Sequence, residues 1–262
     1  MAFVDKTTAL IPRRVPDRQA LERCRIISHR GEHDNTNVME NTLQAYDIAT
    51  AAGVWGIEAD IRWTADLVPV ICHDTSPARV FGIATAVSDL SFAQLRAQVP
   101  LIPTLQEVID AFGGNTHLML ELKAEPRPQQ AGQREILQTL LAPLAPARDY
   151  HILALDPALF EQVDFLPKNC LFPVAQTNVA LLSRLSIERA YGGLGGHYLL
   201  LTDRLRQCHE AAGQRLGTGF PGSKNCLFRE LNRGIEWIFS NNAVEMQSVR
   251  DQHLAMLSRS VQ

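Results

Sequence analysis

Short apolar segments alternate with helical ones along this chain, and that order restricts its fold more than any other feature of the sequence. The first expected strand, 25–29, is followed by a helix that opens around Thr42 and stops at Gly53. A second expected strand, 55–61, comes directly after this helix. A strand, a helix and a strand in succession are the signature of a parallel sheet.

The alternation continues to the end of the chain. After a turn at 64–67, residues 68–73 are expected to return as an antiparallel hairpin strand. Residues 75–102 hold one short expected helix, 88–97, and we interpret them as a small insertion that caps one face. Later strands, each trailed by a helical stretch, are expected at 118–123, 150–155, 170–174, 193–200, 214–220 and 237–240. Eight strand–helix units predict a (β/α)8 TIM barrel that occupies 1–262 as one domain.

Composition argues against several classes of protein. The net charge of −3 favours neither nucleic acid nor an anionic membrane surface as a partner. No apolar run approaches the ~20 residues of a transmembrane helix, and residues 1–25 lack the apolar core of a secretory signal. The five cysteines are scattered without a CxxC pair, which indicates free thiols and a cytoplasmic location. Pro12 and Pro16 predict an irregular lead-in over 1–20.

Two carboxylates stand close together in the expected strand 55–61. Glu58 and Asp60 are two residues apart, so their side chains point to the same face of that strand. If the face is buried, their repulsion requires a cation, and oxygen ligands suit a hard ion such as Mg²⁺ or Ca²⁺. From this segment alone, an ordinary strand edge whose acids face water is the simpler interpretation, and the rest of the chain changes the balance.

Other polar residues are expected to join this pair. Active sites of (β/α)8 barrels lie at the carboxyl ends of the strands, and three adjacent strands of this chain end in charged or titratable residues. Together with the hairpin they would bring three carboxylates, two histidines and two cations into one mouth. The residues expected there are His29, Arg30, Glu58, Asp60, His73, Glu121 and Lys123.

This set of side chains predicts phosphoryl transfer at a phosphodiester. The three carboxylates would hold one divalent ion, which polarises a phosphoryl oxygen. Arg30 and Lys123 would add charge-assisted contacts to the phosphate. His29 and His73 titrate near neutrality, so one can take a proton from the nucleophile while the other gives a proton to the leaving oxygen.

Six short motifs occur in a characteristic order within about residues 25–125. They are H-R-G, E-N-T, I-E-A-D-I, a T-x-D turn followed by H-D, I-P-T-L-Q-E-V and L-E-L-K. In this combination they resemble the glycerophosphodiester phosphodiesterase family. The resemblance implies a (β/α)8 barrel with a small insertion after the H-D motif. It also implies a phosphoric diester hydrolase that converts small glycerophosphodiesters to an alcohol and glycerol 3-phosphate with Mg²⁺ or Ca²⁺.

The resemblance carries over to individual residues of this sequence. It implies His29 and His73 as the acid–base pair, Arg30 and Lys123 on the phosphate, and Glu58, Asp60 and Glu121 as metal ligands. Glu40 of the E-N-T motif would support the start of the following helix, and Asn41 can orient a site residue.

The second half of the chain departs from the family pattern. Gly217-Thr218-Gly219-Phe220-Pro221 stands where a W-T-V-N-like motif is usual, and 239–242 replace T-D-x-P. The insertion 75–102 is also short for the family. The identity of the alcohol that is released is therefore undecided, and a lysophospholipase D-type enzyme acting on lipids is an alternative. A non-catalytic binding barrel is a more distant one. The glycine-rich segment 192–196 is expected to serve close backbone packing.

Overall fold

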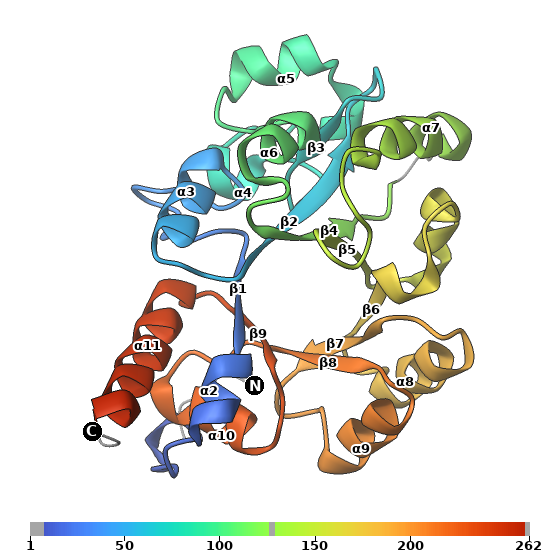
Figure 1. Cartoon of the computed structure of the whole chain (residues 1–262). Helices are drawn as coiled ribbons and strands as arrows, with labels where there is room; N and C mark the ends of the chain where they lie inside the picture. The colour runs from blue at the N-terminus through green and yellow to red at the C-terminus, as the bar shows by residue number, and fades with distance from the viewer. Residues whose placement is uncertain (1–7, 126–128, 260–262) are drawn as a thin grey trace.

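Eight parallel strands form a closed ring in the computed structural model, which describes residues 8–125 and 129–259 (Figure 1). Neighbouring strands pair in parallel, and β1 pairs with both β2 and β9, which closes the ring. The predicted (β/α)8 TIM barrel is confirmed. The strands of the ring are β1 (Arg25–His29), β2 (Gly56–Trp63), β4 (His117–Leu122), β5 (Tyr150–Ala154), β6 (Leu171–Ala175), β7 (Gly193–His197), β8 (Arg215–Gly219) and β9 (Trp237–Ser240).

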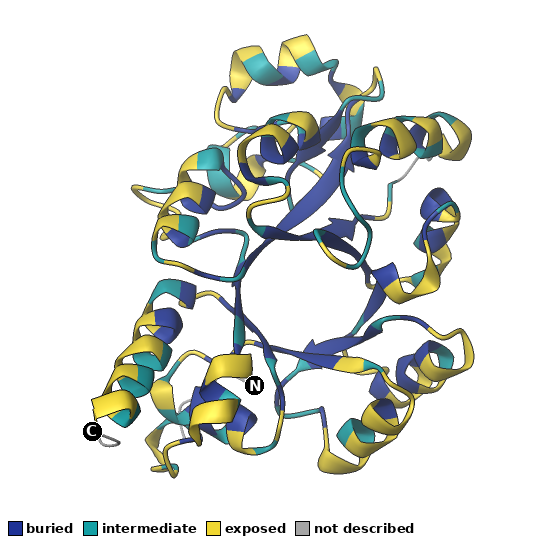
Figure 2. Cartoon of the chain, in the orientation of Figure 1, coloured by how far each residue is buried: buried dark blue, intermediate teal, exposed yellow. Residues whose placement is uncertain are grey.

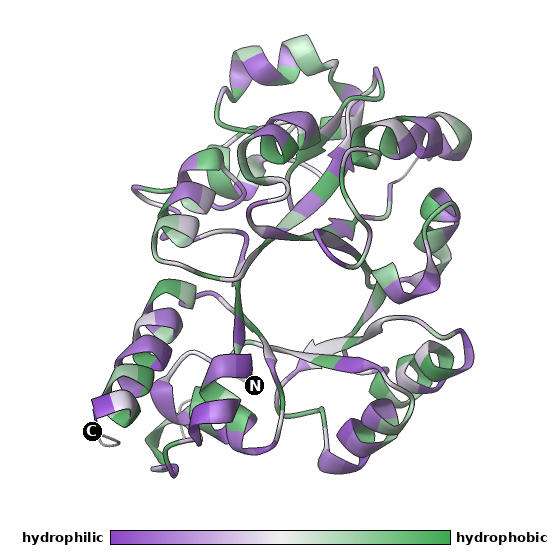
Figure 3. Ribbon diagram, viewed as in Figure 1, coloured by the Kyte–Doolittle hydropathy of each residue, from purple (hydrophilic) through white to green (hydrophobic). Residues whose placement is uncertain are grey.

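Helices lie around the outside of this ring (Figure 1). One example is α6, whose buried residues are spaced at i, i+3, i+4 and i+7, which places one apolar stripe against the strands. Figure 3 shows hydrophobic and hydrophilic residues side by side along these helices, as this arrangement requires. The outer helices are α3 (Leu43–Ala51), α6 (Leu105–Phe112), α7 (Gln130–Leu141), α8 (Val179–Glu188), α9 (Asp203–Ala211), α10 (Lys224–Asn232) and α11 (Ala243–Arg259).

The expectation of an irregular lead-in was wrong. A helix, α2 (Arg18–Arg23), begins inside the segment that was expected to be irregular. Pro12 and Pro16 do not prevent it because both precede its N-cap, Asp17, whose carboxylate accepts a hydrogen bond from the Ala20 N–H. The helical stretch expected after β5 is present as a 3₁₀ helix, η2 (Pro157–Val163).

The ring is buried on both faces (Figure 2). Along β2, Ile57 and Ala59 belong to the main core between the strands and the helices. Residues of the opposite parity point into the ring, where six side chains form a separate apolar cluster. These are Ile27, Met119, Leu153, Phe172, Trp237 and Phe239. The alternation of a strand therefore sends Glu58 and Asp60 into the ring interior.

The segment between β2 and α6 contains β3 (Pro69–Ile71), which pairs antiparallel with β2 as expected. It continues through α4 (Ala78–Phe81), η1 (Val87–Asp89) and α5 (Phe92–Gln98). The single helix expected at 88–97 is thus divided, because Ser91 caps α5 in a capping box with Gln94.

Close packing accounts for part of the glycine-rich segment. A Cβ on Gly193 would lie 2.0 Å from the carbonyl oxygen of Arg215 and 2.4 Å from Cε2 of Phe172. The start of β7 can therefore approach β8 and the inner apolar cluster only without a side chain. Gly196 differs, since a Cβ there would find its nearest atoms at 3.4 Å.

This difference predicts unequal effects of two matched substitutions. Gly193→Ala is expected to lower the free energy of unfolding by about 3 kcal/mol, because backbone and a buried ring must move. Gly196→Ala, the control, is expected to change it by less than about 1 kcal/mol. Urea denaturation followed by circular dichroism measures both. Equal losses would show that the packing at Gly193 is not restrictive.

Candidate active site

The seven residues expected in the barrel mouth come together at the carboxyl ends of β1, β2 and β4. The strand register places His29 of β1 beside Glu58 of β2, and Asp60 of β2 beside Glu121 of β4. Six of the seven line a cavity of about 490 Å³. The seventh, Asp60, lies beneath them with no exposed surface.

Three buried carboxylates form the centre of this mouth. Glu58, Asp60 and Glu121 are 2%, 0% and 8% exposed, and one oxygen of each lies within 4.8 Å of the others. Two cations sit among them. Lys123 Nζ is 2.8 Å from Asp60 Oδ1 and also pairs with Glu121, while Arg30 Nε is 3.3 Å from Asp60 Oδ2. Three negative charges therefore face two positive ones.

Glu58 is the carboxylate for which neither cation provides a direct ion pair. Burial raises the pKa of Asp60, but the charges of Lys123 and Arg30 outweigh it and bring that pKa to about 2. Burial, and then the charges of Asp60 and Glu121, hold the pKa of Glu58 well above its usual value. Its Oε2 accepts the backbone N–H of Arg30 at 3.1 Å, but no described residue donates to its Oε1.

This donor set fits a divalent cation. A buried carboxylate oxygen without a donor is costly, and a cation relieves both that cost and the repulsion among the three acids. Oxygen-only ligands of this kind suit Mg²⁺ and Ca²⁺. Glu58, Asp60 and Glu121 are the residues that can hold such an ion.

His29 is oriented from the last strand of the ring. Its Nδ1 lies 2.6 Å from Oδ1 of Asn241, an atom that only accepts, so Nδ1 carries the proton and Nε2 presents a lone pair. Nε2 is 3.8 Å from Glu58 Oε2. Burial, followed by the charge of Arg30, lowers the pKa of His29 to about 4, so the ring is neutral near pH 7. The Phe220 ring packs against it edge-on.

His73 is oriented by acids and by the insertion. Its Nδ1 is 2.8 Å from Asp74 Oδ1, and Arg79 of α4 donates to Asp74 Oδ2 at 2.7 Å. Arg79 also donates to both oxygens of Glu40, which in turn accepts from Arg30. Burial lowers the pKa of His73, although Asp60 and Asp74 act in the opposite direction.

Several residues that hold the site residues in position were only partly predicted from the sequence. Asn41 Nδ2 donates to Asp60 Oδ2 at 2.8 Å, the kind of contact expected for the E-N-T asparagine. Glu40 lies just before the helix start but pairs with Arg30 and Arg79. No local pattern indicated Asn241, because it is 212 residues away from His29.

The opposite wall of the cavity is mostly apolar. Leu153, Leu155, Val174, Phe220 and Phe239 line it. Between them run Gly195, Gly196, Gly217 and Gly219, where main chain alone faces the cavity. Gln176, Thr177 and His197 add polar groups to this wall. The cavity thus has a charged half from the first strands and a mainly apolar half from the later ones.

Comparison with known proteins shows which family the first half of the chain resembles. The sequence model of the Glycerophosphoryl diester phosphodiesterase family matches residues 29–152. Glycerophosphodiester phosphodiesterase 1 of Mus musculus is 32% identical over 143 residues, which cover 47% of this chain and 42% of that protein. Residues 29–152, a little under half of this chain, thus carry the sequence pattern of the glycerophosphodiester phosphodiesterase family.

Two further proteins match this chain, one in sequence and one in structure. A lysophospholipase D of Rattus norvegicus is 33% identical over 105 residues, which cover 34% of this chain and 33% of that protein. The matches to both mammalian proteins thus span less than half of their lengths. The structure of an Oleispira antarctica phosphodiesterase in complex with sn-glycerol-3-phosphate shares the fold, with a TM-score of 0.73 at 21% identity. The superposition covers 87% of this chain and 96% of the Oleispira antarctica chain.

The structure also bears on membrane insertion. Within residues 8–125 and 129–259, no helix combines the length and the apolar character that a bilayer crossing requires.

The excess charge on Glu58 predicts opposite effects of one substitution on stability and on ion binding. Glu58→Gln removes one of three like charges, so the variant is expected to be about 1–2 kcal/mol more stable in EDTA. It is also expected to lose the stabilisation that Mg²⁺ or Ca²⁺ confers. Thermal unfolding with EDTA and with each ion measures both effects.

Glu210→Gln serves as the control, because this residue forms an exposed pair with Arg206 on α9. It is expected to change neither quantity. A Glu58→Gln variant that is less stable in EDTA, or that either ion still stabilises fully, would contradict the assignment.

Proposed function

We propose that this protein hydrolyses glycerophosphodiesters to an alcohol and glycerol 3-phosphate. One observation carries the proposal: a buried carboxylate oxygen of Glu58 lacks a donor among the described residues, beside two histidines whose ring nitrogens are already oriented. The match of residues 29–152 to the family model supports it, as does the product bound to the Oleispira antarctica phosphodiesterase of the same fold.

Glu58, Asp60 and Glu121 hold one divalent cation, Mg²⁺ or Ca²⁺, in this proposal. When bound, such an ion polarises a phosphoryl oxygen and offsets its negative charge. Arg30 and Lys123 line the cavity beside the carboxylates and bind the remaining phosphoryl oxygens by charge-assisted hydrogen bonds. Their existing ion pairs with Asp60 hold both side chains in position before the substrate arrives.

The two histidines move the protons in this mechanism. Nε2 of His29 presents its lone pair to the cavity because Asn241 binds Nδ1, so it accepts the proton of the nucleophile. Asp74 stabilises a protonated His73, which donates its Nε2 proton to the leaving alcohol oxygen. The same two transfers serve attack by water or by the neighbouring glycerol hydroxyl.

The insertion belongs to the same functional unit, and we propose that 1–262 act as one domain. Arg79 of α4 connects Asp74, which orients His73, with Glu40, which pairs with Arg30. Residues 75–102 thereby support both an acid–base group and a phosphate-binding group.

A lipid substrate is the second candidate. The apolar half of the cavity ends in two exposed side chains, Leu155 and Phe220, which are 39% and 43% exposed. A glycerol or choline group does not require such a surface, whereas an acyl chain gains from burial against it. The match to a lysophospholipase D is consistent with this alternative.

Activity is expected to depend on the divalent ion and on both histidines. Protein stripped with EDTA should release no glycerol 3-phosphate from glycerophosphocholine until Mg²⁺ or Ca²⁺ is returned. His29→Ala and His73→Ala should each lower kcat by about 10²-fold or more, the usual contribution of a general acid or base. His253→Gln on α11, away from the cavity, is the control. Full turnover in EDTA, or in either alanine variant, would refute the mechanism.

The two substrate classes can be separated by a ratio of rates. If the apolar wall binds an acyl chain, Leu155→Ser is expected to lower kcat/KM for lysophosphatidylcholine about 3- to 10-fold, since two or so methylene contacts are lost. The value for glycerophosphocholine should not change. Leu181→Ser, which is exposed on α8 outside the cavity, is the control. An equal effect on both substrates would exclude the wall as an acyl-binding surface.

A further inference from the structure

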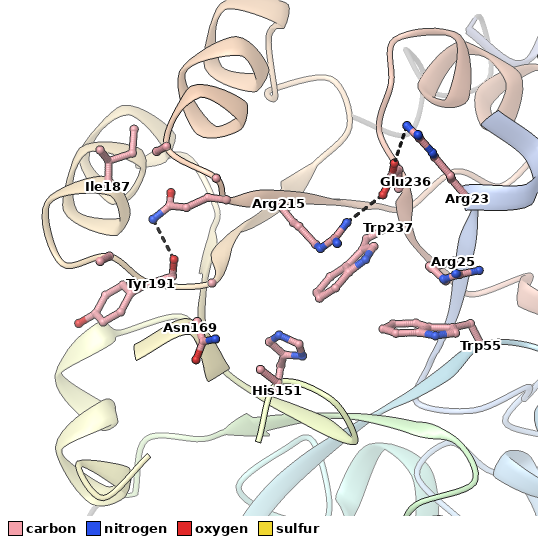
Figure 4. Close-up of a pocket in the computed structure, with 16 residues that line it drawn as sticks. Arg23, Arg25, Trp55, His151, Asn169, Ile187, Tyr191, Arg215, Glu236 and Trp237 are labelled. Atoms are coloured by element: carbon pink, nitrogen blue, oxygen red, sulfur yellow. Dashed lines mark hydrogen bonds and ion pairs between the residues drawn. The ribbon is translucent and has the colours of Figure 1, made fainter. Parts of the chain in front are cut away.

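A second cavity opens at the opposite end of the barrel (Figure 4). Its volume is about 780 Å³, within the range of pockets that bind small molecules. It lies where the strands begin: Arg25, Arg215 and Trp237 are the first residues of β1, β8 and β9, and Trp55 immediately precedes β2. None of its lining residues belongs to the candidate active site.

A buried histidine with a free acceptor lies at the bottom of this cavity. His117 Nδ1 is 3.0 Å from the carbonyl oxygen of Arg148, so that nitrogen must donate. Burial lowers the pKa of His117 to about 4 and that of His151 to about 3, so both rings are neutral. His117 Nε2 therefore accepts from His151 Nδ1 at 2.8 Å.

This chain of hydrogen bonds determines what His151 offers to a ligand. With its proton on Nδ1, Nε2 holds a lone pair, and no described residue donates to it. The side chain is only 6% exposed, and its ring projects into the cavity (Figure 4). An unpaired acceptor at this depth matches a ligand that brings an N–H or O–H donor.

Aromatic rings line the cavity beside this acceptor. The rings of Trp55 and Trp237 lie 5.4 Å apart between centroids and are tilted by 40° to each other. His117 stacks on Trp55 at 4.1 Å, and Phe172 stacks on Trp237 at 5.3 Å. The Trp237 ring also contacts His151 edge-on at 5.0 Å. A planar ring system can pack against these rings with its edge toward Nε2 of His151.

The mouth of the cavity is positively charged. Three guanidinium groups, those of Arg23, Arg25 and Arg215, face a single carboxylate, that of Glu236. Glu236 pairs with Arg215 at 2.9 Å and with Arg23 at 3.8 Å, which leaves Arg25 without a carboxylate among the lining residues. Arg215 also lies over the Trp237 ring, 5.7 Å from its centroid. An anionic group is thus attracted to the rim above the aromatic surface.

We propose that this cavity is a second ligand site and that it binds a nucleoside monophosphate. The base packs on Trp55 and Trp237 and donates an N–H to His151, and the phosphate lies among the three arginines at the rim. This binding uses none of the residues that are proposed for diester hydrolysis. The two sites can therefore be occupied at the same time.

Calorimetric titration of the full chain with AMP in EDTA tests the proposal. We expect saturable binding that also quenches tryptophan fluorescence, because Trp55 and Trp237 are two of the three tryptophans. Ribose 5-phosphate, which lacks the base, should bind at least about tenfold more weakly. Equal affinities for the two ligands, or no saturable binding of AMP, would overturn the proposal.

Substitutions at the rim make the test specific to this cavity. Arg215→Ala should weaken AMP binding about tenfold, the loss of one charge-assisted contact. Glu236→Gln, which removes the competing carboxylate, should strengthen binding. Arg204→Ala on α9 is the matched arginine control, and His29→Ala reports on the other end of the barrel. If His29→Ala weakens binding and Arg215→Ala does not, AMP occupies the active site and the proposal fails.

Discussion

The unequal pairing of three buried carboxylates with two cations is the interaction on which the rest of this structure depends. Lys123 and Arg30 neutralise Asp60 and partly Glu121, and Glu58 remains in excess. Such a cluster is tolerable only where strand register, an asparagine and a backbone N–H hold the carboxylates in place, and it still leaves Oε1 of Glu58 without a donor among the described residues. The same geometry that makes it costly in an empty site makes it a selective site for a hard cation.

The sequence predicted the barrel and the members of the mouth for one physical reason. Parallel strands converge at their carboxyl ends, so motifs far apart in the chain, at Glu58 and Glu121, needed only strand assignments to be placed together. Contacts between individual side chains from distant parts of the chain could not be predicted from strand assignments. Asn241 reaches His29 across the seam of the ring, and Arg79 reaches Glu40 from an insertion whose path the hydrophobic pattern did not define.

The cavity at the other end was invisible in the sequence for a related reason. Trp55, His151 and Trp237 read as ordinary core residues at the beginnings of strands, and only the closed ring brings their rings together. The tautomer of His151 is set by His117 and by a carbonyl group of Arg148, a chain that no spacing rule describes. Local irregularities such as α2 were missed because capping by Asp17 outweighs nearby prolines.

The contact between His29 and Asn241 joins the first strand of the ring to the residue that follows its last strand. All three carboxylates and both cations lie before residue 124. The His29 ring, by contrast, gains its orienting partner only where β9 pairs with β1 and closes the ring. Alignment of this imidazole therefore depends on closure of the barrel, which ties a competent site to a finished fold.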